Sequence, residues 1–203
     1  MKKAEKTELT REKILRAAME EFGTNGYAGS SLNNICGAGI SKGLLYHNFA
    51  GRDALYLACV QRCFLDLTAY LREQETGADF HRYLDTRLCY FRKNPLHARL
   101  FFEAVLQPPE ALRIQIDELR TEFDALNRQL FREILKTLPL QLGVTEQDAM
   151  EYFLLMQNLF NGYFSSSIFH GMPLADAMTA HEEKLTKFFS FLLYGIAERR
   201  AEA

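Results

Sequence analysis

The sequence predicts an all-α protein, with three short helices at the N-terminus, a larger helical body after them and about nine helices in total. Apolar residues recur three or four positions apart through most of the 203 residues, as on one face of a helix. No segment alternates apolar and polar residues cleanly enough to predict a strand. Glycines and prolines fall between the periodic segments, where they are expected to end the helices.

The first helix is predicted to have one buried face. Its apolar residues are Ile14, Leu15, Ala18 and Phe22. Thr10 is of a residue type that caps helix N-termini, so the helix is expected to begin there. Gly23 or Gly26 is expected to end it, because glycine readily adopts the conformation found just after a helix.

Serine caps predict where the second and third helices begin. The cap is Ser30 or Ser31 for the second helix and Ser41 for the third. The apolar residues of the second helix are Leu32, Ile35 and Cys36. In the third helix Leu45 and Phe49 lie one turn apart, so both are expected to face the same small core.

A glycine-rich turn separates these two helices. Residues 37–40 read Gly-Ala-Gly-Ile, which is too rich in glycine to continue a helix. Gly39 lies where a tight turn needs a positive φ. Three short helices with such a turn are typical of a helix-turn-helix motif, in which the third helix enters the major groove of DNA.

Longer helices are predicted after residue 51, so the domain boundary is placed between residues 1–51 and residues 52–203. Their expected ranges are 52–72, 80–92, 96–106, 112–138, 145–164 and 174–196. The helix over 112–138 carries the longest apolar stripe in the chain, so it is expected to be continuous along a partner surface.

The last two helices are apolar on two faces. One face is expected to pack in the protomer's own core, and the other is expected to be covered by a second surface. The residues expected at a dimer interface are Leu155, Leu159, Tyr163, Phe188, Leu192 and Ile196. Two such helices from each of two copies would form a four-helix bundle. The alternative is that both faces serve the core of a single protomer.

The N-terminal segment also resembles the TetR family of transcriptional regulators. The matching run, residues 11–55, reads REKILRAAMEEFGTNGYAGSSLNNICGAGISKGLLYHNFAGRDAL. It covers about a quarter of the chain and keeps the order and spacing of the family's residues. The resemblance implies an N-terminal DNA-binding domain and a helical regulatory domain for ligand binding and dimerisation.

The candidate DNA-binding residues are Ser31, Ser41, Lys42, Gly43, Leu44, Tyr46, His47 and Arg52. Lys42, Tyr46 and His47 offer groups that donate hydrogen bonds to phosphate oxygens, and the resemblance implies the same roles. For Ser31 and Arg52, phosphate contact is implied by the resemblance. Gly43 is expected to let the third helix approach the groove closely.

Three positions differ from the family's usual residues. Leu44 stands where threonine is common, so it can contact a thymine methyl group but cannot hydrogen-bond a base. Asn48 stands where an aromatic residue or histidine is common, and Cys36 replaces the usual alanine. The first two differences leave the DNA sequence that is recognised open.

The aromatic composition of the body favours an apolar ligand cavity. Aromatic residues make up 12% of the chain and are concentrated after residue 56. The candidate lining residues are Tyr83, Arg87, Tyr90, Phe101, Phe123, Asn127, Met156 and Phe160. They fall on helices that the family layout places around a ligand, with Arg87 and Asn127 as polar anchors.

No catalytic, metal or cofactor site is predicted. The five histidines, His47, His81, His97, His170 and His181, are nowhere three or four residues apart, so no helix offers two of them on one face. Nucleophile-elbow, phosphate-loop and dinucleotide-binding motifs are absent from the sequence. The chain is therefore not expected to be an enzyme.

The sequence predicts a cytoplasmic protein without a membrane span. The longest apolar stretch, residues 188–197, is about half the length that a bilayer requires. Charges fill the N-terminus where a secretory signal would be apolar. The four cysteines, Cys36, Cys59, Cys63 and Cys89, include no Cys-x-x-Cys pair. Cys59 and Cys63 are one turn apart and are expected to be buried, with a redox role as the alternative.

These features predict a homodimeric repressor that binds a palindromic DNA operator and leaves it when a small apolar or aromatic ligand binds. Two alternatives stay open. One is a helical carrier or enzyme whose N-terminal helices only pack. The other is a helix-turn-helix regulator that senses a protein or a redox state.

The charge distribution supports a nucleic-acid partner although the formal net charge is −2. Residues 1–52 hold eight basic and five acidic residues, whereas the remainder holds 16 basic and 21 acidic residues. A basic N-terminal part on an acidic body directs contact with DNA to the N-terminal part.

Overall fold

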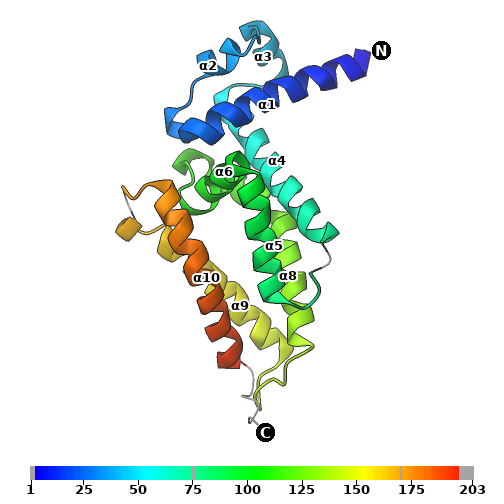
Figure 1. Ribbon diagram of the computed structural model, residues 1–203, viewed down its shortest axis with the longest axis vertical. Coiled ribbons are helices and arrows are strands. Elements are labelled where there is room, and N and C mark those ends of the chain that lie inside the picture. Colours follow the sequence, from blue (N-terminus) through cyan, green and yellow to red (C-terminus); the bar gives the residue numbers. More distant parts are fainter. Residues whose placement is uncertain (1–2, 75, 170, 197–203) are drawn as a thin grey trace. The chain divides into compact units, whose positions relative to one another are not determined.

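The computed structural model describes residues 3–74, 76–169 and 171–196, with side chains except at positions 3, 4, 6, 195 and 196. The predicted all-α class is confirmed: these residues form ten α-helices and two short 3₁₀ segments, and none lies in a β-strand (Figure 1). The α-helices are α1 (Lys3–Gly29), α2 (Leu32–Gly37), α3 (Lys42–Asn48), α4 (Arg52–Glu73), α5 (Phe80–Lys93), α6 (Pro95–Leu106), α7 (Arg113–Leu119), α8 (Thr121–Leu135), α9 (Glu146–Phe164) and α10 (Leu174–Ile196).

The chain falls into two compact units. Unit 1 holds the described residues among 1–66 and 91–121, and unit 2 holds those among 67–90 and 122–203. The units divide α4 and α5, because one part of each helix packs in each unit. The domain boundary at residue 51 stays a prediction.

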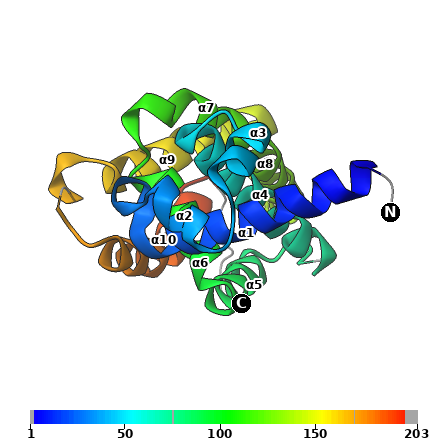
Figure 2. The same ribbon diagram turned by 90° about the horizontal axis from the view of Figure 1, so that it is seen from above.

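Unit 1 is built around α1 and the first part of α4. Ile14, Phe22 and Tyr56 are fully buried, and the rings of Phe22 and Tyr56 meet edge to face at 5.2 Å between centroids. Each such side chain contributes about 1.5–3 kcal/mol by leaving water. Helices α2 and α3 lie on one side of α1 (Figure 1), and the view from above shows both uncovered (Figure 2).

Unit 2 contains α8, α9, α10 and parts of α4 and α5. Helices α9 and α10 run antiparallel and side by side (Figure 1). Phenylalanines fill the space between helices, with Phe131 stacked on Phe153 at 4.2 Å and Phe160 against Phe164 at 5.1 Å between centroids. Helix α9 begins with the predicted capping box, in which Thr145 and Asp148 exchange hydrogen bonds.

The predicted start of the first helix was wrong. Helix α1 begins at Lys3, so Thr10 lies inside it. The residues before Thr10 include alanine, glutamate and lysine, which favour helices, and Glu5 lies in the first turn, where a negative charge complements the helix dipole. Of the two predicted ends, Gly26 interrupts the helical geometry with φ 71° and ψ 175°.

The predicted continuous helix over 112–138 was also wrong. It is divided into a 3₁₀ turn, α7 and α8, with a break at Arg120. The Thr121 hydroxyl donates to the Glu118 carbonyl oxygen at 2.7 Å, which closes α7. Ile116 is buried in unit 1 and Phe123 in unit 2. Apolar spacing persists across the break, so periodicity alone does not reveal it.

One described helix, α4, has the length and hydropathy of a membrane span. Half of its most apolar window is buried inside the protein. Leu55, Tyr56 and Val60 are among its fully buried residues. A helix that packs into a protein core shows the same pattern. The length and hydropathy of α4 are therefore weak evidence for a membrane location.

Candidate nucleic-acid interface

The start of α2 is fixed by a serine cap and by a carboxylate from α1. The Ser31 side chain accepts a hydrogen bond from the Asn34 backbone N–H at 3.1 Å, which confirms one of the two predicted caps. Glu21 Oε1 accepts from the Ser31 backbone N–H at 3.0 Å and from the Asn34 side chain at 2.8 Å. These hydrogen bonds position α2 against α1.

The turn between α2 and α3 has the geometry that its glycine predicts. Gly39 has φ 76°, and its N–H and that of Ile40 both donate to the Cys36 carbonyl oxygen at 3.1 Å. The Lys13 ammonium group donates to the Gly39 carbonyl oxygen at 3.2 Å. Ile40 is buried beneath the turn. The turn is therefore held both by its own backbone and by α1.

Helix α3 is anchored by one face and at both ends. Ser41 caps its start by accepting from the Leu44 backbone N–H, as predicted. Leu45 and Phe49 are buried, and Phe49 is the extended residue that follows the helix. The Arg11 guanidinium lies 4.4 Å above the Phe49 ring and donates to the Asn48 carbonyl oxygen at 3.2 Å. A cation suits this end of a helix.

The remaining face of α3 is open to solvent. The exposed residues here are Ser41, Lys42, Gly43, Leu44, Tyr46 and His47. A Cβ atom added at Gly43 would meet no heavy atom within 4 Å, so the backbone is accessible there. Six of the eight candidate DNA-binding residues thus form one exposed surface, which we call the α3 face. It presents an ammonium, a phenol and an imidazole beside an accessible backbone.

Arg52 packs on Tyr27 near the end of α1, and its contact with a phosphate stays a prediction. Its guanidinium lies 4.1 Å over the Tyr27 ring, and Nη2 donates to the Ser30 hydroxyl at 3.3 Å. The Tyr27 hydroxyl donates to Asp53 at 2.7 Å, which raises the pKa of Tyr27. The sequence does not reveal this because the kink at Gly26 brings Tyr27 onto the start of α4.

Three residues that support the α3 face were not singled out in the sequence. Arg11 and Lys13 were counted only as charges, and Glu21 only as an acid. All three lie on α1 and reach backbone groups of the motif. For Arg11 and Lys13, the signal that the sequence offers is a basic residue three positions and one position before Ile14.

A half-buried carboxylate joins three helices of unit 1. Glu103 in α6 accepts from the Tyr27 backbone N–H at 2.9 Å and from the Tyr56 hydroxyl at 3.0 Å. Burial raises the pKa of Glu103, although both hydrogen bonds oppose that shift. A Cβ atom at Gly26 would lie 2.8 Å from Glu103 Oε1, so glycine is needed there for space as well as for φ.

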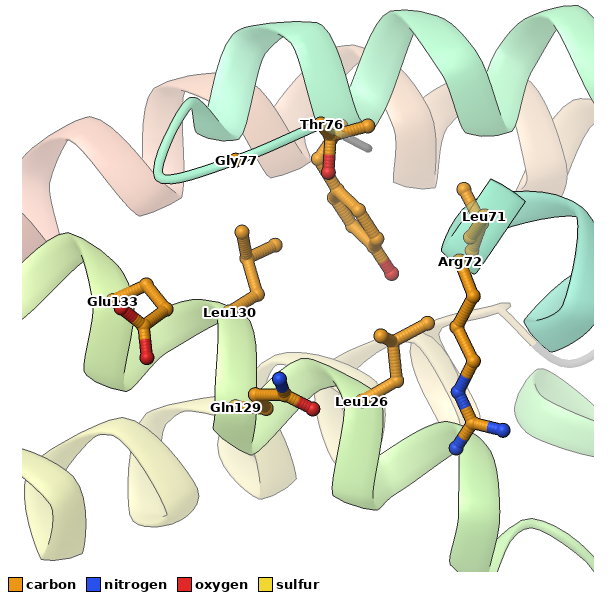
Figure 3. Close-up of a pocket in the computed structure, with 9 residues that line it drawn as sticks. Leu71, Arg72, Thr76, Gly77, Leu126, Gln129, Leu130 and Glu133 are labelled. Carbon is orange, nitrogen blue, oxygen red and sulfur yellow. The ribbon is translucent and has the colours of Figure 1, made fainter. Parts of the chain in front are cut away.

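Unit 2 contains a separate cavity of about 320 Å³. Its lining residues are Leu71, Arg72, Thr76, Gly77, Tyr83, Leu126, Gln129, Leu130 and Glu133. Leu126, Leu130 and Glu133 follow one another along α8, opposite the end of α4 and the loop after it (Figure 3). The cavity lies at the lower end of the size range for small-molecule sites.

Only Tyr83 of the eight candidate ligand residues lines this cavity. Its hydroxyl donates to Asn127 Oδ1, and the two predicted polar anchors, Arg87 and Asn127, are not among the lining residues. The other candidates in unit 2 are Tyr90, Phe123, Met156 and Phe160, which pack elsewhere. Phe101 packs in unit 1 against Phe64 at 5.4 Å between ring centroids, and its role at a ligand site stays a prediction. The lining leucines of α8 were part of the predicted stripe and were interpreted as core.

The candidate dimer residues divide into exposed and buried groups. Leu155, Leu159 and Tyr163 are exposed on α9, together with Tyr152. Leu192 is a correction, because it is 4% exposed and belongs to the core of its own unit. Phe188 is half-buried and packs on Phe160 at 4.7 Å between centroids. The side chain of Ile196 lies outside the described residues, whereas α10 exposes Phe191 and Tyr194.

Cys59 and Cys63 lack the properties of reactive thiols. Cys59 and Cys63 are buried free thiols, as the sequence predicts. Burial raises the pKa of both, which disfavours the reactive thiolate. In the described part of the chain, no three residues among His, Cys, Asp and Glu gather into a group that would hold a metal ion.

Comparison with known proteins identifies the N-terminal segment. Residues 14–59 match the family described as bacterial regulatory proteins, tetR family. The chain is 38% identical over 76 residues to the HTH-type transcriptional regulator UidR of Escherichia coli (strain K12). The matched region covers 37% of this chain and 39% of UidR, so it spans about two fifths of the relative's length.

Solved structures share the fold over nearly the whole chain. A TetR-family transcriptional regulator from Pectobacterium atrosepticum aligns with a TM-score of 0.64 and 18% identity, over 98% of this chain and 99% of that one. FadR from Bacillus subtilis, solved in complex with stearoyl-CoA, aligns with a TM-score of 0.59 and 16% identity, over 91% and 98%. The N-terminal segment is therefore similar to that of tetR-family regulatory proteins, and the chain shares its fold with these solved structures.

Proposed function

We propose that this protein is a sequence-specific DNA-binding transcriptional regulator without enzymatic activity, acting in the cytoplasm. The observation that carries the proposal is the α3 face. Buried Leu45 and Phe49 hold α3 in place, while Lys42, Tyr46 and His47 stay exposed on the same helix. Groups of these types contact phosphates, and Leu44 suits the methyl group of a thymine.

The regulator is proposed to be a homodimer on a palindromic operator. Helix α9 leaves Tyr152, Leu155, Leu159 and Tyr163 exposed at helical spacing, and α10 leaves Phe191 exposed. An exposed apolar face of this kind is typical of an interface with another chain. Two copies related by a two-fold axis would present two α3 faces to two half-sites.

Repression is proposed to end when a small molecule binds unit 2. The cavity beside Tyr83 supports a site of this kind. The FadR relative was solved with stearoyl-CoA, which supports small-molecule binding within this fold. A ligand shifts the equilibrium only if it binds the DNA-incompetent conformation more tightly than the competent one.

Selection of duplexes from a random oligonucleotide pool by the full chain tests the function. We expect recovery of a two-fold symmetric site whose affinity falls steeply between about 50 and 200 mM salt, because phosphate contacts release counterions. Binding that is absent at low salt would instead favour the helical carrier or enzyme. A recovered site without two-fold symmetry would contradict the dimer.

The dimer itself is tested by measuring molar mass in solution. Leu159→Glu places a charge on the exposed apolar face of α9 and is expected to yield monomers. Leu142→Glu is the matched control, because Leu142 is 99% exposed and lies outside that face. A Leu159→Glu variant that keeps the mass of the unaltered protein would show that this face is not the interface.

A further inference from the structure

Helix α3 is too short to set its own position. It has seven residues, whereas isolated helices shorter than about 12–15 residues are marginally stable in water. Contacts with the rest of unit 1 therefore decide where it lies. Buried Leu45 and Phe49 hold one face against the core, but apolar contacts have no preferred direction, so they leave the tilt of the helix open.

Arg11 in α1 supplies a directional contact at the end of α3. Its Nη1 donates a hydrogen bond to the Asn48 carbonyl oxygen at 3.2 Å, and its guanidinium carbon lies 4.4 Å from the centre of the Phe49 ring. The last carbonyl groups of a helix have no partner inside the helix, and Arg11 satisfies one of them. A planar guanidinium can stack on a ring and donate at the same time, which a lysine ammonium does not reproduce.

Lys13 makes the corresponding contact before α3. Its ammonium group donates to the Gly39 carbonyl oxygen at 3.2 Å, in the turn that leads to Ser41. The turn and α3 are thus tied to α1 at both ends through backbone carbonyl groups. These carbonyl groups are present whichever side chains α3 carries. Without Arg11, the start of α3 would stay tied and its end would be free to tilt.

A tilt of α3 would affect base contacts more than phosphate contacts. Long side chains such as Lys42 can follow a phosphate, and phosphate contacts supply the affinity that is independent of sequence. Base edges are read by short contacts of defined geometry, and the Leu44 side chain has little reach to compensate for a displaced backbone. Loss of the tie at Arg11 should therefore reduce affinity for the correct sequence in particular.

We propose that Arg11 is a positioning residue that determines how well this protein discriminates its operator from other DNA. It acts through Asn48 and Phe49 and does not itself contact the DNA. The inference rests on the proposed function, which it deepens. Because Arg11 is exposed, the rival assignment is a direct contact with a phosphate, and the two assignments predict different results.

The test compares two duplexes, the one selected from the random pool and a scrambled duplex of the same length and composition. Arg11→Met removes the guanidinium, and Arg11→Lys keeps only its charge. Arg16→Met is the matched control, because Arg16 is an exposed cation of the same helix and lies near Glu12. Fluorescence anisotropy at several salt concentrations measures each affinity, after circular dichroism has shown that the variant is folded.

Arg11→Met is expected to weaken binding of the selected duplex at least about fivefold, which corresponds to the loss of one base contact. It is expected to change the affinity for the scrambled duplex by less than about twofold, because the phosphate contacts persist. Arg11→Lys is expected to lose discrimination as well, since charge alone does not restore the stacked hydrogen bond. Arg16→Met is expected to keep the ratio of the two affinities.

Equal weakening of both duplexes by Arg11→Met, with a salt slope lower by about one unit, would overturn the proposal, because a phosphate contact behaves in this way. Full discrimination by Arg11→Lys would overturn it too, since a cation at this position would then suffice. An unchanged affinity ratio in Arg11→Met would show that Arg11 does not position α3 for base contacts.

Amide hydrogen exchange tests the tie without DNA. The Phe49 backbone N–H donates to the Leu45 carbonyl oxygen at 2.9 Å and reports on the end of α3. Arg11→Met is expected to speed its exchange at least about threefold, and Arg16→Met is not. Unchanged exchange would overturn the inference. Failure of the unaltered protein to select any DNA would overturn the proposed function, and exchange would then show separately whether Arg11 holds α3. If Arg11→Met does not fold, Arg11→Lys takes its place in both measurements.

Discussion

The carboxylate of Glu103 accepts a hydrogen bond from the backbone N–H of Tyr27 at 2.9 Å, directly after the kink at Gly26. The same carboxylate accepts from Tyr56 in α4. Because Tyr27 also contacts Arg52 and Asp53, one half-buried carboxylate joins the end of α1 to the start of α4, and Arg52 extends this contact to Ser30, just before α2. This contact sets the direction in which the chain enters the helix-turn-helix motif.

Gly26→Ala is therefore expected to destabilise the protein. Its φ of 71° with ψ of 175° belongs to a region that is almost restricted to glycine, and its Cβ would lie 2.8 Å from Glu103. The strain alone costs about 1–3 kcal/mol. Urea denaturation measures the change. Gly37→Ala is the control, because a Cβ there meets nothing within 4 Å, and a Gly26→Ala variant as stable as this control would refute the role given to the kink.

The pairing of Glu182 predicts a specific acid sensitivity. Burial by itself raises the pKa of Glu182, but the Arg87 charge and the hydrogen bonds from His181 and Arg87 lower it to about 2. A lowered carboxyl pKa contributes stability above the ordinary value of 4.5, and that stability is lost as the pH falls toward 2. The lowering of the Glu182 pKa corresponds to a contribution of roughly 3 kcal/mol to the free energy of unfolding at neutral pH.

Glu182→Gln is accordingly expected to reduce the free energy of unfolding at pH 7 and to flatten its pH dependence below pH 4.5. Denaturant titrations across this range measure both effects. Glu118→Gln, at an exposed carboxylate, is the matched control and should keep the acid sensitivity. An equal pH slope in the two variants would mean that Glu182 is not the group responsible.

Lys42→Ala is expected to weaken DNA binding similarly for all sequences, because Lys42 is exposed at the start of α3 and is assigned to the phosphates. The slope of log affinity against log salt should fall by about one unit. Fluorescence anisotropy at several salt concentrations measures it, with Lys136→Ala in unit 2 as the matched control. A change of preference at one base pair would show instead that Lys42 contacts a base.

Phe49→Ala is expected to destabilise unit 1 by about 3–5 kcal/mol, as for other buried aromatic residues. Phe49 is 5% exposed and also supports the Arg11 guanidinium, which holds the end of α3. Thermal unfolding measures the loss, and Tyr46→Ala, on the exposed side of α3, is the control for stability. Unchanged stability would place Phe49 outside the core.

Much of the candidate interface was predictable because its local structure depends on local chemistry. Ser31 and Ser41 cap helices wherever a helix follows them, and Gly39 supplies the positive φ that the turn requires. The one-turn spacing of Leu45 and Phe49 predicts which face of α3 is buried. Such rules act over about four residues, so they can be applied to a sequence.

The sequence by itself therefore determined the all-α class, the helix-turn-helix and the exposed face of α3. Tertiary structure alone decided the rest. It turned Arg52 toward Tyr27, joined Glu103 to the kink at Gly26, and divided the stripe over 112–138 between two units. The physical reason is the separation along the chain of the residues that interact. Caps and turns involve neighbours in the chain, whereas Glu103 lies 76 positions from Tyr27. Only the packing of helices brings these two residues together.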